Sequence, residues 1–150
     1  LKADIKKVEA PNDLKVAPAF LFTDAAGKTA STKDLKGKVV FINFWASWCP
    51  PCQAEMPSII ALYKRLEKDD RFVFLFMNED DDKEKAKKYL ERNQYSIPLY
   101  NRSGTVPNEI FSGTLPTTLV INKEGKIVLR HEGMAGYDTD AFLRQLEDLL

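Results

Sequence analysis

The sequence has few cysteines and no excess of charge of either sign. Only two of its 150 residues are Cys, and 22 acidic side chains balance 22 basic ones. A chain of this length fits one domain that buries about two-thirds of its unfolded surface, so it needs no disulfide framework to fold. The balanced charge gives no overall attraction to nucleic acid or to an anionic membrane, and we predict neither as a partner.

Long apolar runs are also missing. No stretch approaches the roughly 18 apolar residues that a membrane span requires, and no basic and apolar leader opens the chain. Because residue 1 is Leu rather than Met, we expect a processed or trimmed chain, and whether an export signal or a membrane anchor was removed from it stays open. These absences therefore leave the location of the protein open.

Strand-like and helical patterns alternate in the middle of the chain. Residues 39–45 and 71–77 are nearly unbroken runs of apolar, β-favouring side chains, which is typical of strands covered on both faces. Each run is followed by a segment with a helical pattern, at 49–68 and at 81–92. This alternation predicts an α/β fold.

Shorter elements are expected on either side of this region. We predict short strands at 19–23 and 97–100, and an antiparallel hairpin that joins residues 117–121 to residues 126–130. A last helix begins near residue 139 and closes the chain.

These patterns together predict an α/β sandwich built on a mixed sheet. Residues 1–16 are polar and read as an N-terminal arm, so we place the domain at residues 17–150. The chain shows no internal repeat and no tract of low complexity.

Both cysteines stand in one motif, Trp-Cys-Pro-Pro-Cys at residues 48–52. The pair ends an apolar run and opens a helical pattern, which indicates a dithiol that is oxidised and reduced in turn. The N–H groups and the dipole of a helix N-terminus favour negative charge, so we predict a lowered pKa for the Cys49 thiol at the exposed helix end. Cys52 lies one turn further in, on the buried stripe. We expect Cys49 to attack and Cys52 to resolve the mixed disulfide.

Glu55 is the second informative residue of this helix. On a helical wheel it falls inside the apolar stripe, one turn from Cys52. A carboxylate in such surroundings has a raised pKa and is a candidate to accept the proton of the Cys52 thiol. The alternative is a Glu at the edge of the stripe that reaches solvent or pairs with a Lys.

Two tryptophans and two prolines surround the dithiol. We expect Trp45 to pack in the core, and Trp48, next to the nucleophile, to be an exposed platform for a partner polypeptide. Pro50 and Pro51 remove two N–H donors and fix φ at the start of the helix, which stiffens the loop. We count Pro50 with Trp48 among the residues that contact a substrate.

The segment from Trp45 to Pro57 resembles the thioredoxin superfamily, specifically its TlpA/ResA-like reductases. The resemblance covers about residues 17–150 and implies a thioredoxin fold, in which helices flank a mixed central sheet. It further implies a leading hairpin, a kink of the dithiol helix at Pro57 and a helical insertion at 81–111.

The resemblance also assigns roles to residues far from the dithiol. It implies that Pro116 is a cis-proline facing the cysteines, and that the backbone around Leu115 pairs with an incoming substrate strand. Thioredoxins proper carry a buried Asp where this chain has Asn43, and Asn cannot exchange protons. Glu55 matches the acidic residue that ResA-like members carry three places after the second cysteine, so the resemblance supports Glu55 as the proton acceptor.

The resemblance finally implies a location and a set of partners. ResA-like members are extracytoplasmic proteins, exported or tethered to a membrane, that reduce disulfides in other proteins. In many of them the substrate is apocytochrome c. We therefore expect protein substrates that carry a disulfide, an upstream thiol electron donor, no cofactor and a membrane tether, if there is one, outside this chain.

Three other functions fit parts of the sequence. A disulfide oxidase or isomerase would use the same fold, because the direction of exchange depends on the reduction potential and on the redox partner. A metal-binding module would hold Cu(I) or half a zinc site with two thiolates, but we assign no metal ligands. The single histidine, His131, lies past the predicted hairpin and reads as a surface or packing residue. A peroxidase is disfavoured, because peroxiredoxins carry a Thr where this chain has Ala46.

Overall fold

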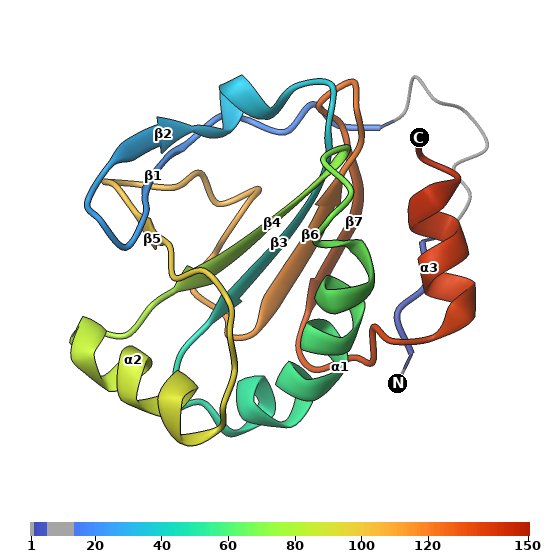
Figure 1. Cartoon of the computed structure of the whole chain (residues 1–150). Coiled ribbons are helices and arrows are strands. Elements are labelled where there is room, and N and C mark those ends of the chain that lie inside the picture. The colour runs from blue at the N-terminus through green and yellow to red at the C-terminus, as the bar shows by residue number, and fades with distance from the viewer. Residues whose placement is uncertain (1, 6–13) are drawn as a thin grey trace.

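A four-stranded mixed sheet lies at the centre of the computed structural model, which describes residues 2–5 and 14–150 (Figure 1). Within these ranges the strand order is β4-β3-β6-β7. The strands are β3 (Val39–Trp45), β4 (Phe72–Asn78), β6 (Thr117–Ile121) and β7 (Ile127–Glu132). β3 runs parallel to β4 and antiparallel to β6, and β6 pairs antiparallel with β7. The predicted α/β class and its mixed sheet are confirmed.

Helices cover one face of this sheet. They are α1 (Pro50–Leu66), α2 (Lys83–Arg92) and α3 (Asp140–Glu147), and Figure 1 shows α1 and α3 together on the right of the sheet. Their apolar sides meet Val39, Phe41 and Trp45 of β3 in what we call the helix-side core. Alternate residues of a strand point to opposite faces, so Asn43 also points to this side.

A smaller sheet covers the other face. In the described residues it has the order β2-β1-β5, with β1 at Leu21–Thr23, β2 at Thr29–Ser31 and β5 at Asn101–Arg102. The short 3-10 helix η2 (Thr32–Leu35) follows β2. The predicted leading hairpin, β1 with β2, is therefore confirmed.

The second core lies between the two sheets. This hairpin-side core contains Phe20, Phe22, Ile42, Phe44 and Phe111 among its members. The rings of Phe44 and Phe111 stack, with centroids 4.3 Å apart and planes within 5° of parallel. Since both faces of β3 are covered, all seven of its residues are buried, as its apolar composition predicts.

Local signals set most element boundaries. Pro stands at the first position of α1, Asp82 caps α2 and Thr139 caps α3, each cap accepting a backbone N–H. The inner face of α2 consists of its three buried residues, Ala86, Tyr89 and Leu90. The helix predictions are confirmed to within two residues at most ends. Pro57 lies inside α1, and Figure 1 shows the helix changing direction partway along.

Two predictions about strands are wrong. Residues 97–100 form no strand, and only Tyr100 makes an isolated bridge, with Met77. Pro98 cannot donate a ladder hydrogen bond, and the strand starts after it, at β5, which pairs with β1. β7 also continues to Glu132, so His131 lies inside the hairpin, opposite Thr118, and not past it.

The described part of the N-terminal arm lies against the domain. Lys2 bridges to Gly136, and the Ile5 N–H donates to Oε1 of Gln145 at 2.8 Å. Val16 bridges to Lys126. The remainder of the predicted arm, residues 1 and 6–13, lies outside the described residues, and the division after residue 16 stays a prediction. No helix in the described part of the chain is both long and apolar enough to cross a bilayer.

Candidate active site

The two cysteines form a disulfide at the N-terminus of α1. Their Cα atoms are 5.3 Å apart, and Cys49 is the N-cap, whose Sγ accepts the backbone N–H of Cys52 at 3.3 Å. A sulfur at this position faces the N–H groups and the positive end of the helix dipole, which favour a thiolate after reduction.

Both cysteines are buried in the disulfide form. Cys49 is 3% exposed and Cys52 is 1% exposed. The expectation of an exposed Cys49 is therefore wrong for this state. The bond draws the Cys49 sulfur toward Cys52, which lies on the inward stripe of α1, and both residues belong to the helix-side core.

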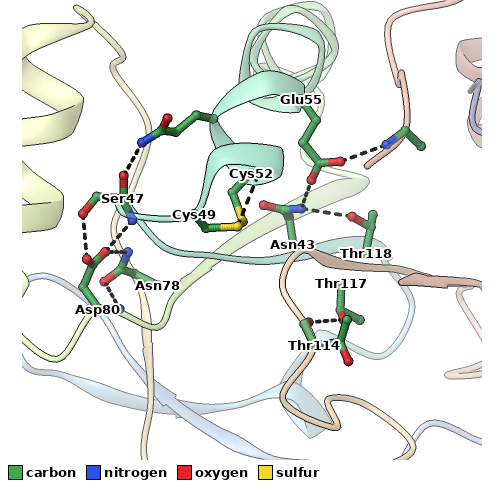
Figure 2. The surroundings of a disulfide bond; sticks show 12 residues. Asn43, Ser47, Cys49, Cys52, Glu55, Asn78, Asp80, Thr114, Thr117 and Thr118 are labelled. Atoms are coloured by element: carbon green, nitrogen blue, oxygen red, sulfur yellow. Dashed lines mark hydrogen bonds between the residues drawn. A yellow bond between two sulfur atoms is a disulfide. The ribbon is translucent and has the colours of Figure 1, made fainter. Parts of the chain in front are cut away.

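The loop before Cys49 is fastened to the end of β4 (Figure 2). Oδ2 of Asp80 accepts the Ser47 N–H at 2.9 Å, and Oδ1 accepts the Ser47 hydroxyl at 2.6 Å. The Asn78 amide donates to Oδ2 of Asp80 at 2.7 Å, and the Gln53 amide donates to the Ser47 carbonyl at 2.5 Å. These contacts arise because β3 and β4 are parallel, so the chain leaves both strands at the same edge of the sheet.

Sequence reasoning missed this cluster around Asp80. The signal was a polar triplet, Asn78 to Asp80, directly after a buried strand that pairs parallel to β3. Asp80 is 8% exposed, so its carboxylate holds the loop from a nearly buried position.

Glu55 lies one turn after Cys52 and is 2% exposed. Burial raises its pKa from 4.5 to about 7, although hydrogen bonds from the Ala135 N–H and the Asn43 amide partly oppose the rise. The predicted position inside the apolar stripe and the predicted direction of the pKa are confirmed, and the alternative of a side chain that reaches solvent is wrong. A carboxyl group with a pKa near 7 both accepts and releases protons at neutral pH.

Asn43 connects Glu55 to the sheet. Its Nδ2 donates to Oε1 of Glu55 and to Oγ1 of Thr118, both at 3.0 Å, and the register of β3 and β6 pairs Asn43 with Thr118. The other Glu55 oxygen accepts the Ala135 N–H at 3.1 Å. Sequence reasoning noted only that Asn43 cannot exchange protons. The available signal was Asn43, the one polar residue of an otherwise apolar strand.

Trp48 and Pro50 border the disulfide on the solvent side. Trp48 is 65% exposed, whereas Trp45 is fully buried and packs in the helix-side core, so both predicted placements are confirmed. Pro50 is exposed at the first position of α1. That Trp48 and Pro50 contact a substrate stays a prediction.

The Leu115–Pro116 peptide bond is cis, as the resemblance implied. β6 begins at Thr117, which pairs with Phe44 of β3, so Pro116 lies at the end of the sheet from which the dithiol loop departs. The Thr117 hydroxyl donates to the Thr114 carbonyl at 2.6 Å and closes the turn before the strand. The contact of Leu115 and Pro116 with a substrate stays a prediction.

Residues 2–5 and 14–150 contain no group of three or more His, Cys, Asp or Glu side chains placed to hold a metal ion.

Known proteins share both the sequence pattern and this architecture. The Redoxin family matches residues 11–142. The thiol-disulfide oxidoreductase ResA of Bacillus cereus is 38% identical over 115 residues, which cover 76% of this chain and 66% of that protein. This chain therefore spans about two-thirds of the length of that relative.

Two solved structures agree with the fold. A putative thiol:disulfide interchange protein DsbE from Chlorobium tepidum aligns with a TM-score of 0.74 and 26% identity, over 91% of this chain and 96% of that one. A putative protein disulfide isomerase from Bacteroides thetaiotaomicron aligns with a TM-score of 0.75 and 26% identity, over 91% and 88% of the two chains. The chain belongs to the Redoxin family, with ResA thiol-disulfide oxidoreductases among its homologues and the thioredoxin fold that their resemblance implied.

Proposed function

We propose that this protein is a thiol-disulfide oxidoreductase that reduces disulfides in other proteins through Cys49 and Cys52. The observation that carries the proposal is a disulfide at a helix N-terminus with a buried carboxyl group, Glu55, one turn away. The helix N-terminus favours a thiolate nucleophile at Cys49, and Glu55 supplies a proton acceptor whose pKa of about 7 suits neutral pH.

The reaction runs in two exchanges. The Cys49 thiolate attacks one sulfur of the substrate disulfide, forms a mixed disulfide and releases the other substrate sulfur as a thiolate. Glu55 then takes the proton of Cys52, whose thiolate attacks Sγ of Cys49. This second exchange forms the Cys49–Cys52 disulfide and frees the second substrate sulfur, and a dithiol donor restores the starting state by the reverse chemistry.

Residues around the disulfide would receive the substrate. Trp48 offers an exposed aromatic surface beside Cys49, and Pro50 is exposed next to it. Leu115 and Pro116 lie at the same end of the sheet, and the backbone of Leu115 would pair with an extended segment of a substrate.

The likeness to ResA proteins supports an extracytoplasmic location and a disulfide-bearing protein as substrate. Apocytochrome c is the substrate class that ResA-like reductases suggest. An upstream thiol donor and a membrane tether outside this chain belong to the same proposal.

Trapping tests the exchange directly. We expect Cys52→Ser to accumulate a mixed disulfide through Cys49 when the reduced variant meets a small protein with an accessible disulfide, because the resolving thiol is missing. A non-reducing gel with mass spectrometry identifies the adduct. Cys49→Ser is the matched control and is expected to form none, and a lack of any adduct with Cys52→Ser contradicts the proposal.

The direction of exchange is tested by the reduction potential. Equilibration of the Cys49/Cys52 couple with glutathione buffers gives this value. A potential near the ~−270 mV of thioredoxin, or below it, supports a reductase, whereas a value near ~−120 mV indicates an oxidant and contradicts the proposed direction.

A further inference from the structure

The side chain of Asn43 is only half used by the network around Glu55. Asn43 is fully buried, and its Nδ2 donates to both Glu55 and Thr118. Its Oδ1 is also buried and accepts a hydrogen bond from none of the residues that the structure describes. A buried acceptor without a donor is unfavourable, and such atoms in a native protein require an explanation.

The two donated bonds fix the direction of this oxygen. Because Nδ2 faces Glu55 and Thr118, Oδ1 must point away from both. Figure 2 shows it directed toward the Cys49–Cys52 disulfide. The reversed amide would set Oδ1 against the carboxylate oxygen of Glu55, so two acceptors would face each other, and the observed orientation is the favourable one.

Whether a donor is present for Oδ1 of Asn43 depends on the redox state of the two cysteines. Neither sulfur of a disulfide carries a hydrogen, so neither can donate to Oδ1. Reduction creates an S–H group on Cys52, which is 1% exposed and lies in the helix-side core. In that buried position the thiol is shielded from bulk water.

We propose that Oδ1 of Asn43 accepts the S–H group of Cys52 once the disulfide is reduced. This inference rests on the proposed dithiol function. In the reduction a donor dithiol supplies two electrons and two protons and becomes a disulfide. Cys52 keeps one of these protons as the S–H that binds Asn43, and Cys49 releases the other to solvent when it ionises.

Two consequences follow from a hydrogen bond that exists only after reduction. It stabilises the dithiol relative to the disulfide, so it makes the reduction potential less negative. It also keeps Cys52 protonated beside Glu55, whose oxygen shares the same Asn43 amide, until the mixed disulfide forms.

Asn43→Leu removes the acceptor while keeping a side chain of similar volume. With the couple equilibrated against glutathione, we expect the ratio of disulfide to dithiol to rise about three- to tenfold, which corresponds to a potential about 14 to 30 mV more negative. Thr118→Val is the matched control, because it removes the other partner of Nδ2 and leaves Oδ1 in place. A shift in the opposite direction, no shift, or an equal shift in Thr118→Val would overturn the inference.

Repeating the substitution in a Glu55→Gln protein distinguishes the effect of Asn43 from that of Glu55. Asn43→Leu also removes a hydrogen bond from Glu55, so the same comparison is made in Glu55→Gln protein. The shift is expected to persist there, because it acts on the Cys52 thiol. Its loss would show that Asn43 acts only through Glu55 and would overturn the inference.

A spectroscopic measurement leaves Asn43 intact. In Cys49→Ser protein, Cys52 is the single thiol, and its S–H stretch in the Raman spectrum reports hydrogen bonding. We expect a frequency below that of a thiol in apolar solvent, and a frequency equal to it overturns the inference. If the parent protein cycles between disulfide and dithiol but the Cys52 S–H makes no hydrogen bond, only this inference is wrong. If the parent protein does not cycle at all, the proposed function is wrong.

Discussion

Three polar side chains, Glu55, Asn43 and Thr118, are held inside an otherwise apolar core. All three are at most 2% exposed, and each is tied to another by hydrogen bonds of 3.0 Å. A buried carboxyl group is tolerated because both of its oxygens accept hydrogen bonds, from Asn43 and from the Ala135 N–H. The same burial brings its pKa to about 7, where a proton acceptor works at neutral pH.

The pKa of Glu55 predicts a pH-dependent stability. The unfolded carboxyl group releases its proton near pH 4.5 and the folded one near pH 7. Between these values the native state holds a proton that the unfolded state has lost, so the native state is increasingly penalised as the pH rises. The penalty is absent below about pH 4.5 and complete above about pH 7, where it amounts to about 3 kcal/mol.

Glu55→Gln tests this linkage. Because Gln does not ionise, we expect the variant to lose less free energy of unfolding between pH 5 and pH 8 than the parent does. Urea denaturation at each pH measures the difference. The exposed Glu91 of α2 supplies the control, Glu91→Gln, which should follow the parent. Parallel pH profiles for the parent and Glu55→Gln would show that Glu55 titrates normally.

Among the elements, the loop between β3 and α1 depends on the end of β4. Ser47 is bound through both its N–H and its hydroxyl by Asp80, and Gln53 of α1 binds the Ser47 carbonyl from the other side. The loop that carries Trp48 and Cys49 is thus fixed at its midpoint. The N-cap position of Cys49 depends on this anchor as well as on the helix itself.

Asp80→Ala is expected to loosen this loop. The substitution leaves the Ser47 N–H and the Asn78 amide without an acceptor, so we expect a loss of about 2 kcal/mol in the free energy of unfolding. Hydrogen exchange at the Ser47 amide should also become faster. Ser47→Ala removes only the hydroxyl contact and is expected to cost less, about 1 kcal/mol. Unchanged exchange at residue 47 in Asp80→Ala would contradict the proposed anchoring.

In the molecule as a whole, the central sheet separates two cores that differ in composition. The helix-side core contains the disulfide and borders Glu55 and Asn43, whereas the hairpin-side core is purely apolar among its named members. β3 contributes alternate residues to both. We therefore expect stability and the proposed redox chemistry to be partly separable by face.

Phe111→Ala tests this separation. Phe111 stacks on Phe44 in the hairpin-side core, and its truncation leaves a cavity, so we expect a loss of about 3–5 kcal/mol in the free energy of unfolding. The reduction potential of the Cys49/Cys52 couple should stay within a few millivolts of the parent value, because the cavity lies on the opposite face. A large change in the potential would show that the two cores are coupled.

Local patterns in the chain determined most strands, the helices and the dithiol. Glu55 could be placed on the buried stripe because helical periodicity depends only on neighbours along the chain. The same holds for the cap at Thr139 and for the inner face of α2. The strand predicted at 97–100 failed, because the choice of pairing partner for a short segment is not a local property.

The partners of the buried polar groups came only with the three-dimensional arrangement. The hydrogen bonds from Asn43 to Thr118, from Ala135 to Glu55 and from Ser47 to Asp80 join residues 75, 80 and 33 positions apart. Such contacts depend on the order and register of β4, β3 and β6, which many distant apolar side chains fix together. The sequence by itself therefore indicated which groups would carry the proposed chemistry, while the packing of the sheet decided how Glu55 and the disulfide are held.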